Sequence, residues 1–564
     1  MAYKEIYKKW LEAAQGEEIQ QELMSIKDDE AQIKERFFSD LPFGTAGLRG
    51  IIGAGTARMN RYTVGRATQA LSEHINAQGG ADKGMVIAYD SRRYSREFAE
   101  ETACVFAGNG IKAYIFKQLT SVPELSFAVR HLRAAGGVVI TASHNPKDYN
   151  GYKVYAAYGG QLGPEESLAV MERIQMVDAF GGIKSISFDE GVAQGRIMQI
   201  GEEIDESYKE SLISLCGNEE AAGLTVVYTP LHGAGLRTVQ SIFPAAGIRD
   251  LHVVEEQSAP DGLFPTVKSP NPEDHDAMQM AISLAKQVKA DIAIGTDPDA
   301  DRMGAAARDQ DGNYRMLSGN QIGCILIAYL LEKRKAEGKL SPADYIIKSF
   351  VSTTLADAIA AHYGIVCHTV LTGFRFISEI ITQNENTGAE FIFGFEESYG
   401  FLAGNDVRDK DGVMAALLLC KAAQHYKAKG SELRDVLNAL NAQYGFYTES
   451  VRNIAFAGLD GMERMAAIMA TLRKINDKNI GGLQLEYTED YLSGMRTAAD
   501  GTQTAINLPK TNAVKYVLEG GAWACVRPSG TEPKIKLYFA SCASSEQEAQ
   551  RQMENMRAYF DKLI

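Results

Sequence analysis

Cysteine is scarce in this sequence, and no two cysteines have the spacing of a zinc site. Seven cysteines are scattered over 564 residues, their number is odd, and none of them forms a CxxC motif. Some lie inside apolar runs, as Cys324 does within residues 322–327. Structural zinc sites and disulfide frameworks use cysteines at short, paired spacings. We therefore expect buried free thiols in a reducing compartment, which predicts a cytoplasmic protein.

Long apolar runs and an excess of positive charge are also missing. The longest apolar runs, near residues 322–331 and 414–420, are shorter than the ~20 residues of a membrane-spanning helix. Charges throughout residues 1–10 leave no apolar core for a signal peptide. The chain has 58 Lys and Arg against 72 Asp and Glu, a net charge of −14. Because nucleic acids and anionic membranes attract basic surfaces, we expect neither as a partner. A few arginines can still bind a small anion.

The common nucleotide-binding motifs are absent as well. No segment fits the P-loop pattern GxxxxGK[ST]. The glycine-rich residues 43–55 fail the GxGxxG pattern, because Arg58 stands at the position of the third glycine. Glycine in this stretch indicates that the backbone approaches a ligand closely. Arg49, within the stretch, is a candidate contact.

An alternation of strand and helix patterns occurs three times, within residues 85–140, 224–294 and 322–393. Strands separated by helical patterns of about 10–15 residues predict βαβ units and parallel sheets. Three similar α/β domains are the economical interpretation.

The two ends of the chain differ from these sections. Residues 1–40 have the spacing of two helices. Strands at 522–526 and 535–539, followed by a helix at 546–563, predict a smaller α+β domain that can move relative to the others. We therefore predict an α/β protein: three similar mixed α/β domains with mainly parallel sheets and a smaller C-terminal α+β domain, around a central cleft. The predicted domains are residues 1–202, 203–313, 314–440 and 441–564.

A polar segment follows the last strand of each α/β section. These segments are residues 141–146, 296–302 and 394–400. The carboxyl ends of parallel strands are where ligands bind in open α/β sheets. In the first segment, Ser143 is placed as a nucleophile, with His144 beside it and Lys153 farther along the same loop. An ordinary polar turn explains this segment equally well, because Ser, Asn and Pro are common turn residues.

Asp297, Asp299 and Asp301 alternate along the second segment. Three carboxylates so close repel one another, and a divalent cation explains them best. An EF-hand needs Gly and Glu where Arg302 and Arg308 stand, and the phosphatase pattern D-x-D-x-[TV] fails at Asp301. Oxygen ligands with room for a phosphoryl oxygen suit Mg²⁺. The alternative is a solvated acidic turn.

Two further segments can recognise a sugar phosphate. Glu396, Glu397 and Ser398 follow an apolar strand and can hydrogen-bond sugar hydroxyls or carry protons. A helix N-terminus would explain the acidic residues there equally well. Residues 527–534 combine the Arg527 guanidinium, two hydroxyls and a glycine turn, which together form a cradle for a phosphate dianion.

Taken together, these segments resemble the α-D-phosphohexomutase superfamily, the phosphoglucomutases and phosphomannomutases. The resemblance spans nearly the whole chain and keeps the family's order of motifs. Residues 43–63 are similar to the longer phosphoglucomutase-2-type branch. The matching segments are the phosphoserine loop at 141–146, the metal loop at 297–302, the sugar loop at 394–398 and the phosphate loop at 527–531.

The resemblance implies a role for individual residues. The residues implied in catalysis are Ser143 as phosphoryl carrier, with His144, Lys153 and Arg49 near it. The implied ligands of one Mg²⁺ per chain are Ser143, Asp297, Asp299 and Asp301. The implied substrate contacts are Arg302, Thr372, Gly373, Arg375, Glu396, Ser398, Arg527, Ser529, Gly530 and Thr531. Arg92, like Arg49, matches a first-domain arginine near the cleft. Many relatives have Lys where Arg375 stands, and because Arg hardly gives up a proton, Lys153 becomes the stronger candidate for proton transfer.

The implied reaction is the interconversion of glucose 1-phosphate and glucose 6-phosphate, with glucose 1,6-bisphosphate as intermediate and activator. Within the family, phosphomannomutase, phosphopentomutase and sugar-bisphosphate synthase activities remain alternatives. A non-catalytic sugar-phosphate sensor is a remote alternative, because a sensor needs no phosphoryl carrier. We expect small sugar phosphates as the ligands, and a monomer or a homodimer.

Overall fold

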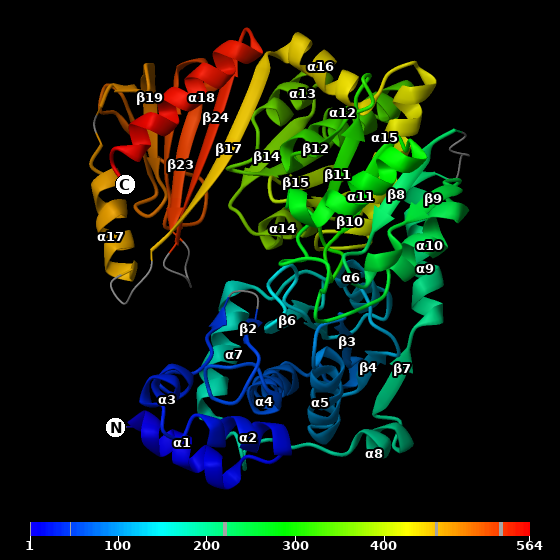
Figure 1. The fold of residues 1–564 in the computed structure, drawn as a ribbon, viewed down its shortest axis with the longest axis vertical. Coiled ribbons are helices and arrows are strands. Elements are labelled where there is room, and N and C mark those ends of the chain that lie inside the picture. The colour runs from blue at the N-terminus through cyan, green and yellow to red at the C-terminus, as the bar shows by residue number, and fades with distance from the viewer. Residues whose placement is uncertain (1, 45–46, 218–222, 457–460, 476, 529–533) are drawn as a thin grey trace. The chain divides into compact units, whose positions relative to one another are not determined.

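Figure 1 shows the computed structural model of the chain. It describes all residues except 1, 45–46, 218–222, 457–460, 476 and 529–533. The chain divides into two compact units, which are described separately. Unit 1 comprises residues 1–322 and 377–432, and unit 2 comprises residues 323–376 and 433–564. In the described part of the chain, no helix combines the length and the apolar character needed to span a membrane.

Unit 1 begins with three helices where the sequence predicted two. They are α1 (Ala2–Ala13), α2 (Glu17–Ser25) and α3 (Glu30–Phe37). The prediction was wrong because Gly16, whose φ is 106°, interrupts the helical pattern between α1 and α2. The three helices share a small core in which the rings of Trp10 and Phe37 meet edge to face, 5.7 Å apart.

A seven-stranded sheet follows, in the order β1-β2-β6-β5-β3-β4-β7. Its strands are β1 (Phe43–Gly44), β2 (Gly47–Ile51), β3 (Met85–Tyr89), β4 (Ala113–Phe116), β5 (Gly136–Ile140), β6 (Tyr149–Ala156) and β7 (Ile197–Ile200). The helices of this part are α4 (Arg61–Ala77), α5 (Ser95–Gly108), α6 (Val122–His131), α7 (Pro164–Met176) and α8 (Phe188–Ala193). Strands β5, β3, β4 and β7 are parallel, whereas β6, β2 and β1 extend the sheet in antiparallel fashion.

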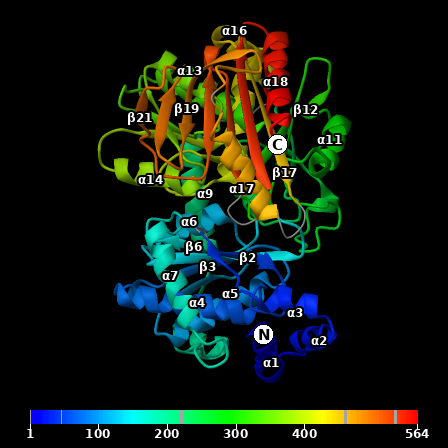
Figure 2. The same cartoon turned by 90° about the vertical axis from the view of Figure 1, so that its left-hand side faces the viewer.

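Strand β5 is buried on both faces, as expected of a parallel strand covered by helices. Val138 and Ile140 belong to a core shared with α4 and α5, whereas Gly137 faces Val129 of α6. Figure 2 shows α4, α5 and α7 beside this sheet. Strand β5 therefore ends, at residues 141–146, in a frame of packed layers.

The predicted position of Lys153 on a loop is wrong. Lys153 lies in β6, where it is paired with Val139 of β5 and Gly47 of β2. The polar residues after Ser143 end at about Tyr149, and the chain then contains Tyr149, Tyr152, Val154 and Tyr155, whose residue types favour strands.

A five-stranded sheet, in the order β12-β11-β10-β8-β9, forms the next part of unit 1. Its strands are β8 (Thr225–Thr229), β9 (Asp250–Val253), β10 (Ile292–Thr296), β11 (Met303–Arg308) and β12 (Tyr314–Leu317). The helices are α9 (Glu202–Cys216), α10 (Gly235–Ala245) and α11 (His275–Val288). Strands β8, β9 and β10 are parallel, but β10 and β11 form an antiparallel hairpin whose turn is the metal loop.

The last part of unit 1 is a hairpin and a buried helix. Strands β15 (Phe391–Glu396) and β16 (Gly400–Leu402) are antiparallel. Helix α15 (Gly412–Ala428) begins at Asp411, whose side chain accepts a hydrogen bond from Met414 N, and its apolar first half is buried. Helices α12 (Gly319–Ala336) and α14 (Phe374–Asn384) cross the limits between the two units.

Unit 2 contains many more strands than the sequence indicated. The C-terminal sheet has the order β17-β24-β23-β22-β19-β20-β21, and β18 pairs with β19. Its strands are β17 (Phe446–Ala455), β18 (Asn479–Ile480), β19 (Leu483–Asp490), β20 (Met495–Ala498), β21 (Gln503–Ala505), β22 (Val514–Leu518), β23 (Trp523–Pro528) and β24 (Lys534–Ala543). The remaining elements are β13 (Tyr345–Ser349), β14 (Val366–Val370), α13 (Leu355–Tyr363), α16 (Leu433–Tyr444), α17 (Gly461–Leu472) and α18 (Glu546–Asp561).

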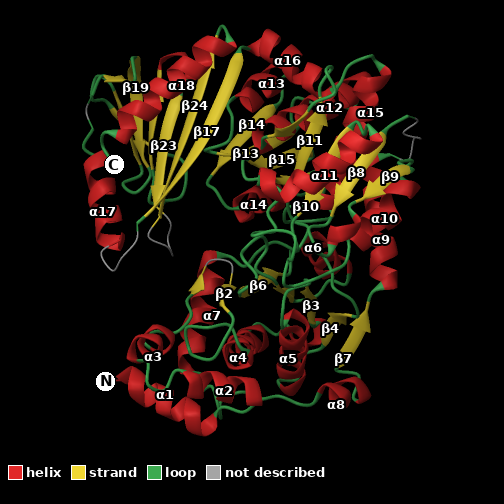
Figure 3. Cartoon of the chain, in the orientation of Figure 1, coloured by secondary structure: helices red, strands yellow, loops and turns green. Residues whose placement is uncertain are grey.

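The sequence identified only β23 and β24 of this sheet. Strand β17 was missed because its residues are half-buried or exposed and mostly polar, so that it shows no apolar run. It is stabilised by pairing along its whole length with β24, about ninety residues later in the chain. Helix α18 packs across β17 and β24 (Figure 3).

Candidate active site

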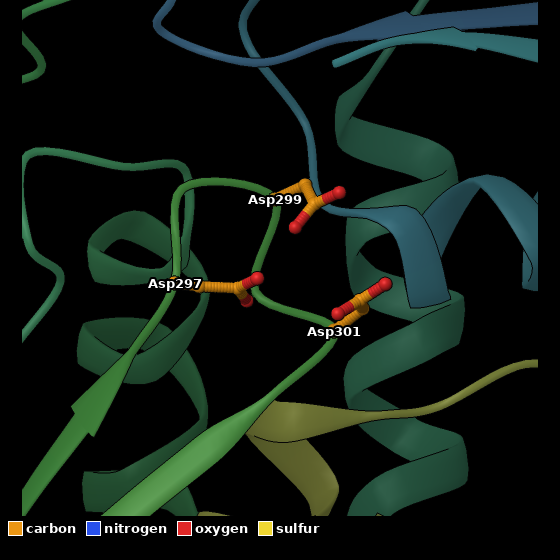
Figure 4. Close-up of side chains that lie close together, drawn as sticks. All are labelled: Asp297, Asp299 and Asp301. Atoms are coloured by element: carbon orange, nitrogen blue, oxygen red, sulfur yellow. The ribbon is translucent and has the colours of Figure 1, made fainter. Parts of the chain in front are cut away.

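The three aspartates of the β10–β11 turn form one buried cluster. One carboxylate oxygen from each of Asp297, Asp299 and Asp301 lies within 4.8 Å of the other two. Figure 4 shows the three side chains leaving the turn with their carboxylates facing a shared space. Gly412 allows this turn to pack against the start of α15, because a Cβ there would lie 2.6 Å from Arg302 O. Its N–H donates to Ala300 O at 3.0 Å.

The cluster fits a divalent cation. Among the described residues, Asp299 Oδ1 and Asp301 Oδ1 are buried and have no hydrogen-bond partner. Burial, together with the charges of Asp299 and Asp301, holds the pKa of Asp297 well above its usual range. Unsatisfied buried oxygens and mutual repulsion are both relieved by a cation that prefers oxygen ligands, as Mg²⁺ does.

Ser143 directs its hydroxyl at this cluster. It is buried, its φ is 51°, and its N–H donates to Thr141 Oγ1 at 2.9 Å. Ser143 Oγ donates to Asp297 Oδ2 at 2.5 Å. A non-glycine residue in the left-handed region is strained, and such strain persists where the surroundings impose the conformation. The loop after β5 therefore presents the serine to the metal loop in one orientation.

Arg92 holds the backbone of the Ser143 loop. Its guanidinium donates to Ser143 O at 2.5 Å, Pro146 O at 2.9 Å and Tyr149 O at 3.1 Å, and also to Asn145 O. Its backbone N–H donates to Asp90 Oδ1. The side chain is buried, so the arginine acts on the loop rather than on solvent.

Arg49 lies on β2 with an exposed side chain, and its Nη1 donates to Asn145 Oδ1 at 3.2 Å. His144 Nδ1 lies 3.1 Å from Ser143 Oγ. Burial, and then the positive charges of Arg302 and Arg49, hold the pKa of His144 well below its usual range. His144 is therefore a neutral hydrogen-bonding neighbour of the serine.

Lys153 contacts the metal loop directly. Its Nζ donates to Asp299 Oδ2 at 2.9 Å and lies 3.5 Å from Asp301 Oδ2. Thr141 Oγ1 donates to the same Asp299 oxygen at 3.1 Å. The antiparallel pairing of β6 with β5 thus brings Lys153 to two of the three aspartates.

Lys410 is a functional candidate that the sequence reasoning missed. Its buried Nζ lies 2.7 Å from Asp301 Oδ2 and 3.4 Å from Asp409 Oδ1. Burial alone would raise the pKa of Asp301, but the charges of Lys410, Lys153 and Arg302 outweigh burial and hold it below its usual range. The signal in the sequence is the charged run 408–411 directly before the apolar start of α15.

The turn between β15 and β16 lies against the turn between β10 and β11. Arg302 and Gly400 form a β-bridge, and Met303 N donates to Tyr399 O at 3.2 Å. Glu396 is buried at the end of β15, and Ser398 is half-buried in the turn that follows. Arg302 donates from its backbone N–H to Asp297 and from Nη1 to Glu273 Oε1 at 2.7 Å.

The other predicted substrate contacts belong to unit 2. Thr372 and Gly373 follow β14, and Arg375 lies in the first turn of α14 with its guanidinium 4.6 Å from the Phe376 ring centre. Arg527 lies on β23, with Nη1 3.4 Å from Tyr538 Oη. Ser529, Gly530 and Thr531 lie outside the described residues.

Four family models match the chain in consecutive segments. They are described as phosphoglucomutase/phosphomannomutase alpha/beta/alpha domain I, domain II and domain III, and the C-terminal domain. The matched residues are 40–179, 206–312, 318–444 and 462–558.

The chain belongs to the phosphoglucomutase/phosphomannomutase family.

Relatives in this family match almost the whole chain. A phosphoglucomutase of Staphylococcus saprophyticus is 37% identical over 547 residues, which cover 97% of this chain and 98% of that protein. A phosphoglucomutase of Staphylococcus aureus is 37% identical over 524 residues, covering 92% and 93%. The protein is an enzyme of the isomerase class, as these relatives are.

Solved structures of the family share the fold. A putative phosphomannomutase of Thermus thermophilus aligns with a TM-score of 0.67 at 23% identity, covering 93% of this chain and 99% of its own. Parafusin, a phosphoglucomutase from Paramecium, aligns with a TM-score of 0.71 at 16% identity, covering 93% and 95%. The predicted fold class, three similar α/β domains and a C-terminal domain, is confirmed.

A buried glutamate behind the metal loop makes stability depend on pH. Glu124 lies in the first turn of α6, two residues after Val122, whose N–H donates to Asp299 O at 2.9 Å. Burial raises the pKa of Glu124 to about 7, although Arg237 Nη2, 3.8 Å away, lowers it in part. The native state therefore binds this proton more tightly than the unfolded chain, and stability falls as pH rises from about 4.5 to about 7.

We expect Glu124→Gln to raise the free energy of unfolding at pH 8 by roughly 2 kcal/mol, because an uncharged amide replaces a buried carboxylate. At about pH 4.5, where Glu124 is protonated, the variant should match the wild type. Urea unfolding at both pH values measures the difference. Glu206→Gln, at an exposed position on α9, is the matched control. An equal effect of Glu124→Gln at both pH values would contradict this assignment.

Proposed function

We propose that this enzyme interconverts glucose 1-phosphate and glucose 6-phosphate, with glucose 1,6-bisphosphate as intermediate and activator. The observation that carries the proposal is the contact of the Ser143 hydroxyl with the buried aspartate cluster, 2.5 Å from Asp297. Phosphoryl transfer depends chiefly on positioning and on neutralisation of charge. A phosphoryl carrier beside a cation site supplies both. The two staphylococcal relatives named phosphoglucomutase support glucose as the sugar.

In the proposed reaction, a free hydroxyl of the sugar attacks the phosphorus carried on Ser143, and the bond from phosphorus to Oγ breaks. Lys153 passes the proton of the attacking hydroxyl to the Ser143 oxygen, while Arg92 keeps the loop backbone in place. The bisphosphate then turns over and returns its other phosphate to Ser143 by the same steps in reverse. One Mg²⁺, when bound to Asp297, Asp299 and Asp301, offsets part of the phosphoryl charge.

We assign substrate recognition to both units. Glu396 and Ser398 bind sugar hydroxyls, and Arg302 and Arg49 add positive charge. Arg527, Ser529, Gly530 and Thr531 bind the phosphate that is not transferred, with Thr372, Gly373 and Arg375 as further contacts. Arg375 contributes charge only, because a guanidinium hardly gives up its proton. Lys153 and Lys410 are buried amines that contact the aspartates. They support proton transfer near the aspartate cluster, and not at Arg375.

We also propose that the enzyme is cytoplasmic. Its proposed domains are residues 1–202, 203–313, 314–440 and 441–564. All seven cysteines are free thiols, four of them buried, which suits a reducing compartment.

Mannose 1-phosphate is the second candidate substrate, because the matching family models cover phosphomannomutases as well.

A panel of sugar 1-phosphates tests the choice of sugar. With Mg²⁺ and a catalytic amount of sugar bisphosphate, we expect kcat/KM to be higher for glucose 1-phosphate than for the mannose, glucosamine or ribose compounds. Higher kcat/KM for any of the other three would replace glucose as the assigned substrate.

Ser143→Ala is expected to reduce mutase turnover to background, because the hydroxyl that carries the phosphoryl group is gone. The reaction is followed by formation of glucose 6-phosphate, and transfer of labelled phosphate from the bisphosphate to the protein should disappear with it. Ser185→Ala, at an exposed position, is the matched control and should keep full activity. Substantial turnover by Ser143→Ala in the presence of the bisphosphate would exclude the phosphoserine mechanism.

Lys153→Ala is expected to lower kcat by roughly 10²–10⁴-fold, the usual scale for a positioned proton carrier. Lys153→Arg separates proton transfer from charge, because Arg keeps the positive charge near Asp299 but hardly releases a proton. We expect Lys153→Arg to keep the stability of the wild type and still lose kcat. Recovery of kcat in the arginine variant would show that only the charge is needed.

A further inference from the structure

A cavity of about 690 Å³ lies within unit 1, apart from the aspartate cluster. It is lined by α2, the segment after β2, the start of α4, α5 and the first residue of α8. Small-molecule sites typically measure about 300–1,000 Å³. None of the residues assigned above to catalysis, metal or substrate lines this cavity.

The floor of the cavity is apolar and only partly covered. Ile19, Ile52, Tyr94 and Phe188 line it as half-buried side chains. Met59 and Phe98 lie beneath as fully buried ones. Apolar surface that stays open to water in this way favours an occupant with an apolar body.

The rim of the cavity is acidic. Six carboxylates line the cavity, the exposed ones of Glu17, Glu18 and Glu97 and the half-buried ones of Glu22, Glu100 and Glu101, against the two guanidinium groups of Arg61 and Arg93. Three of these glutamates are already in ion pairs: Glu22 with Arg36, Glu100 with Arg96, and Glu101 with Arg61. Glu17, Glu18 and Glu97 are in no ion pair among the residues that the structure describes. Arg93 offsets one of these three negative charges, so the charge left over is still negative and favours a cation.

The walls of the cavity also contact the Ser143 loop. Ile52 N donates to Asp148 O at 2.8 Å, and Asn150 Nδ2 donates to Arg93 O at 2.9 Å. Arg93 follows Arg92, the residue that holds the carbonyls of the Ser143 loop. Next to Arg93, Tyr94 donates its hydroxyl to Glu18 Oε2 at 2.6 Å, which joins the start of α5 to α2.

We propose that this cavity is a regulatory site for a small organic cation with an apolar body. The apolar floor binds the body, and Glu17, Glu18 and Glu97 bind the cationic group. The occupant acts on turnover because both walls share hydrogen bonds with residues 148–150, directly after the serine loop. This site lies outside the reaction proposed above and is independent of which sugar the enzyme uses.

Three probes that share one apolar body but differ in the charge of their end group test whether binding requires a positive charge. They are 4-phenylbutylammonium, 4-phenylbutanol and 4-phenylbutyrate, titrated into the full-length protein by isothermal titration calorimetry. We expect the ammonium to bind most tightly and the carboxylate least tightly. Binding of the carboxylate as tight as that of the ammonium would overturn the proposal.

Variants locate the binding in this cavity. The double variant Glu17→Gln/Glu97→Gln should weaken binding of the ammonium about fivefold, as expected for the loss of two partly exposed ion pairs. Glu5→Gln/Glu12→Gln on α1 removes the same charge outside the cavity and should bind like the wild type. Ile19→Trp, which fills the floor, should abolish binding. Equal affinity in the two double variants, or full affinity in Ile19→Trp, would place the cation elsewhere.

A kinetic measurement tests the regulatory role. At a saturating concentration of 4-phenylbutylammonium, kcat of the wild type should change at least twofold, and kcat of Ile19→Trp should not change. An unchanged kcat in the wild type would overturn the regulatory role. Calorimetry does not depend on turnover, so a wrong choice of sugar substrate would leave the binding result intact.

Discussion

The structure depends on the compensation of three buried carboxylates in one five-residue turn. Asp297, Asp299 and Asp301 are buried away from water, and a charge on one of them raises the free energy needed to ionise the others. Lys153 and Lys410 offset part of this cost by direct contact. These two lysines come from β6 and from the segment before α15, so electrostatics joins three distant parts of unit 1. Two carboxylate oxygens still lack partners among the described residues, which leaves a place for a divalent cation.

The hydrogen bond from Ser143 to Asp297 depends on the negative charge of this aspartate cluster. The hydroxyl can donate to Asp297 only while it carries its hydrogen, so the 2.5 Å contact describes the unphosphorylated serine. A phosphoserine has no hydrogen to donate there, and its negative oxygens would face an anionic cluster. A cation between them changes repulsion into attraction. The proposed phosphoryl carrier, in the loop after β5, and the proposed cation site, in the β10–β11 turn, therefore complement each other.

Much of the chemistry was predictable because it is local in sequence. Ser143 directly follows an apolar strand, and the three aspartates lie within five residues of one another, so adjacent residues carry the whole pattern. Lys410 was missed because its meaning depends on Asp301, more than a hundred residues away. Strand β17 was missed for the same reason, because its polar segment is held as a strand by pairing with β24, which is distant in sequence. Lys153 was identified, but its place on β6 follows from the register with β5, which no short segment reveals.

The sequence by itself determined the α/β class and the family, and it supplied the residues that we propose to carry phosphate and to bind a cation. Strand periodicity, turn residues and closely spaced carboxylates are short-range properties, and they persist in any fold that the chain adopts. Only the tertiary structure decided which charges meet: Lys153 and Lys410 on the aspartates, Arg92 on the serine loop, and an acidic rim above an apolar floor between α2 and α5. Such contacts join residues far apart along the chain. Their energies depend on distance and burial, which are set by the packing of whole elements and not by neighbours in sequence.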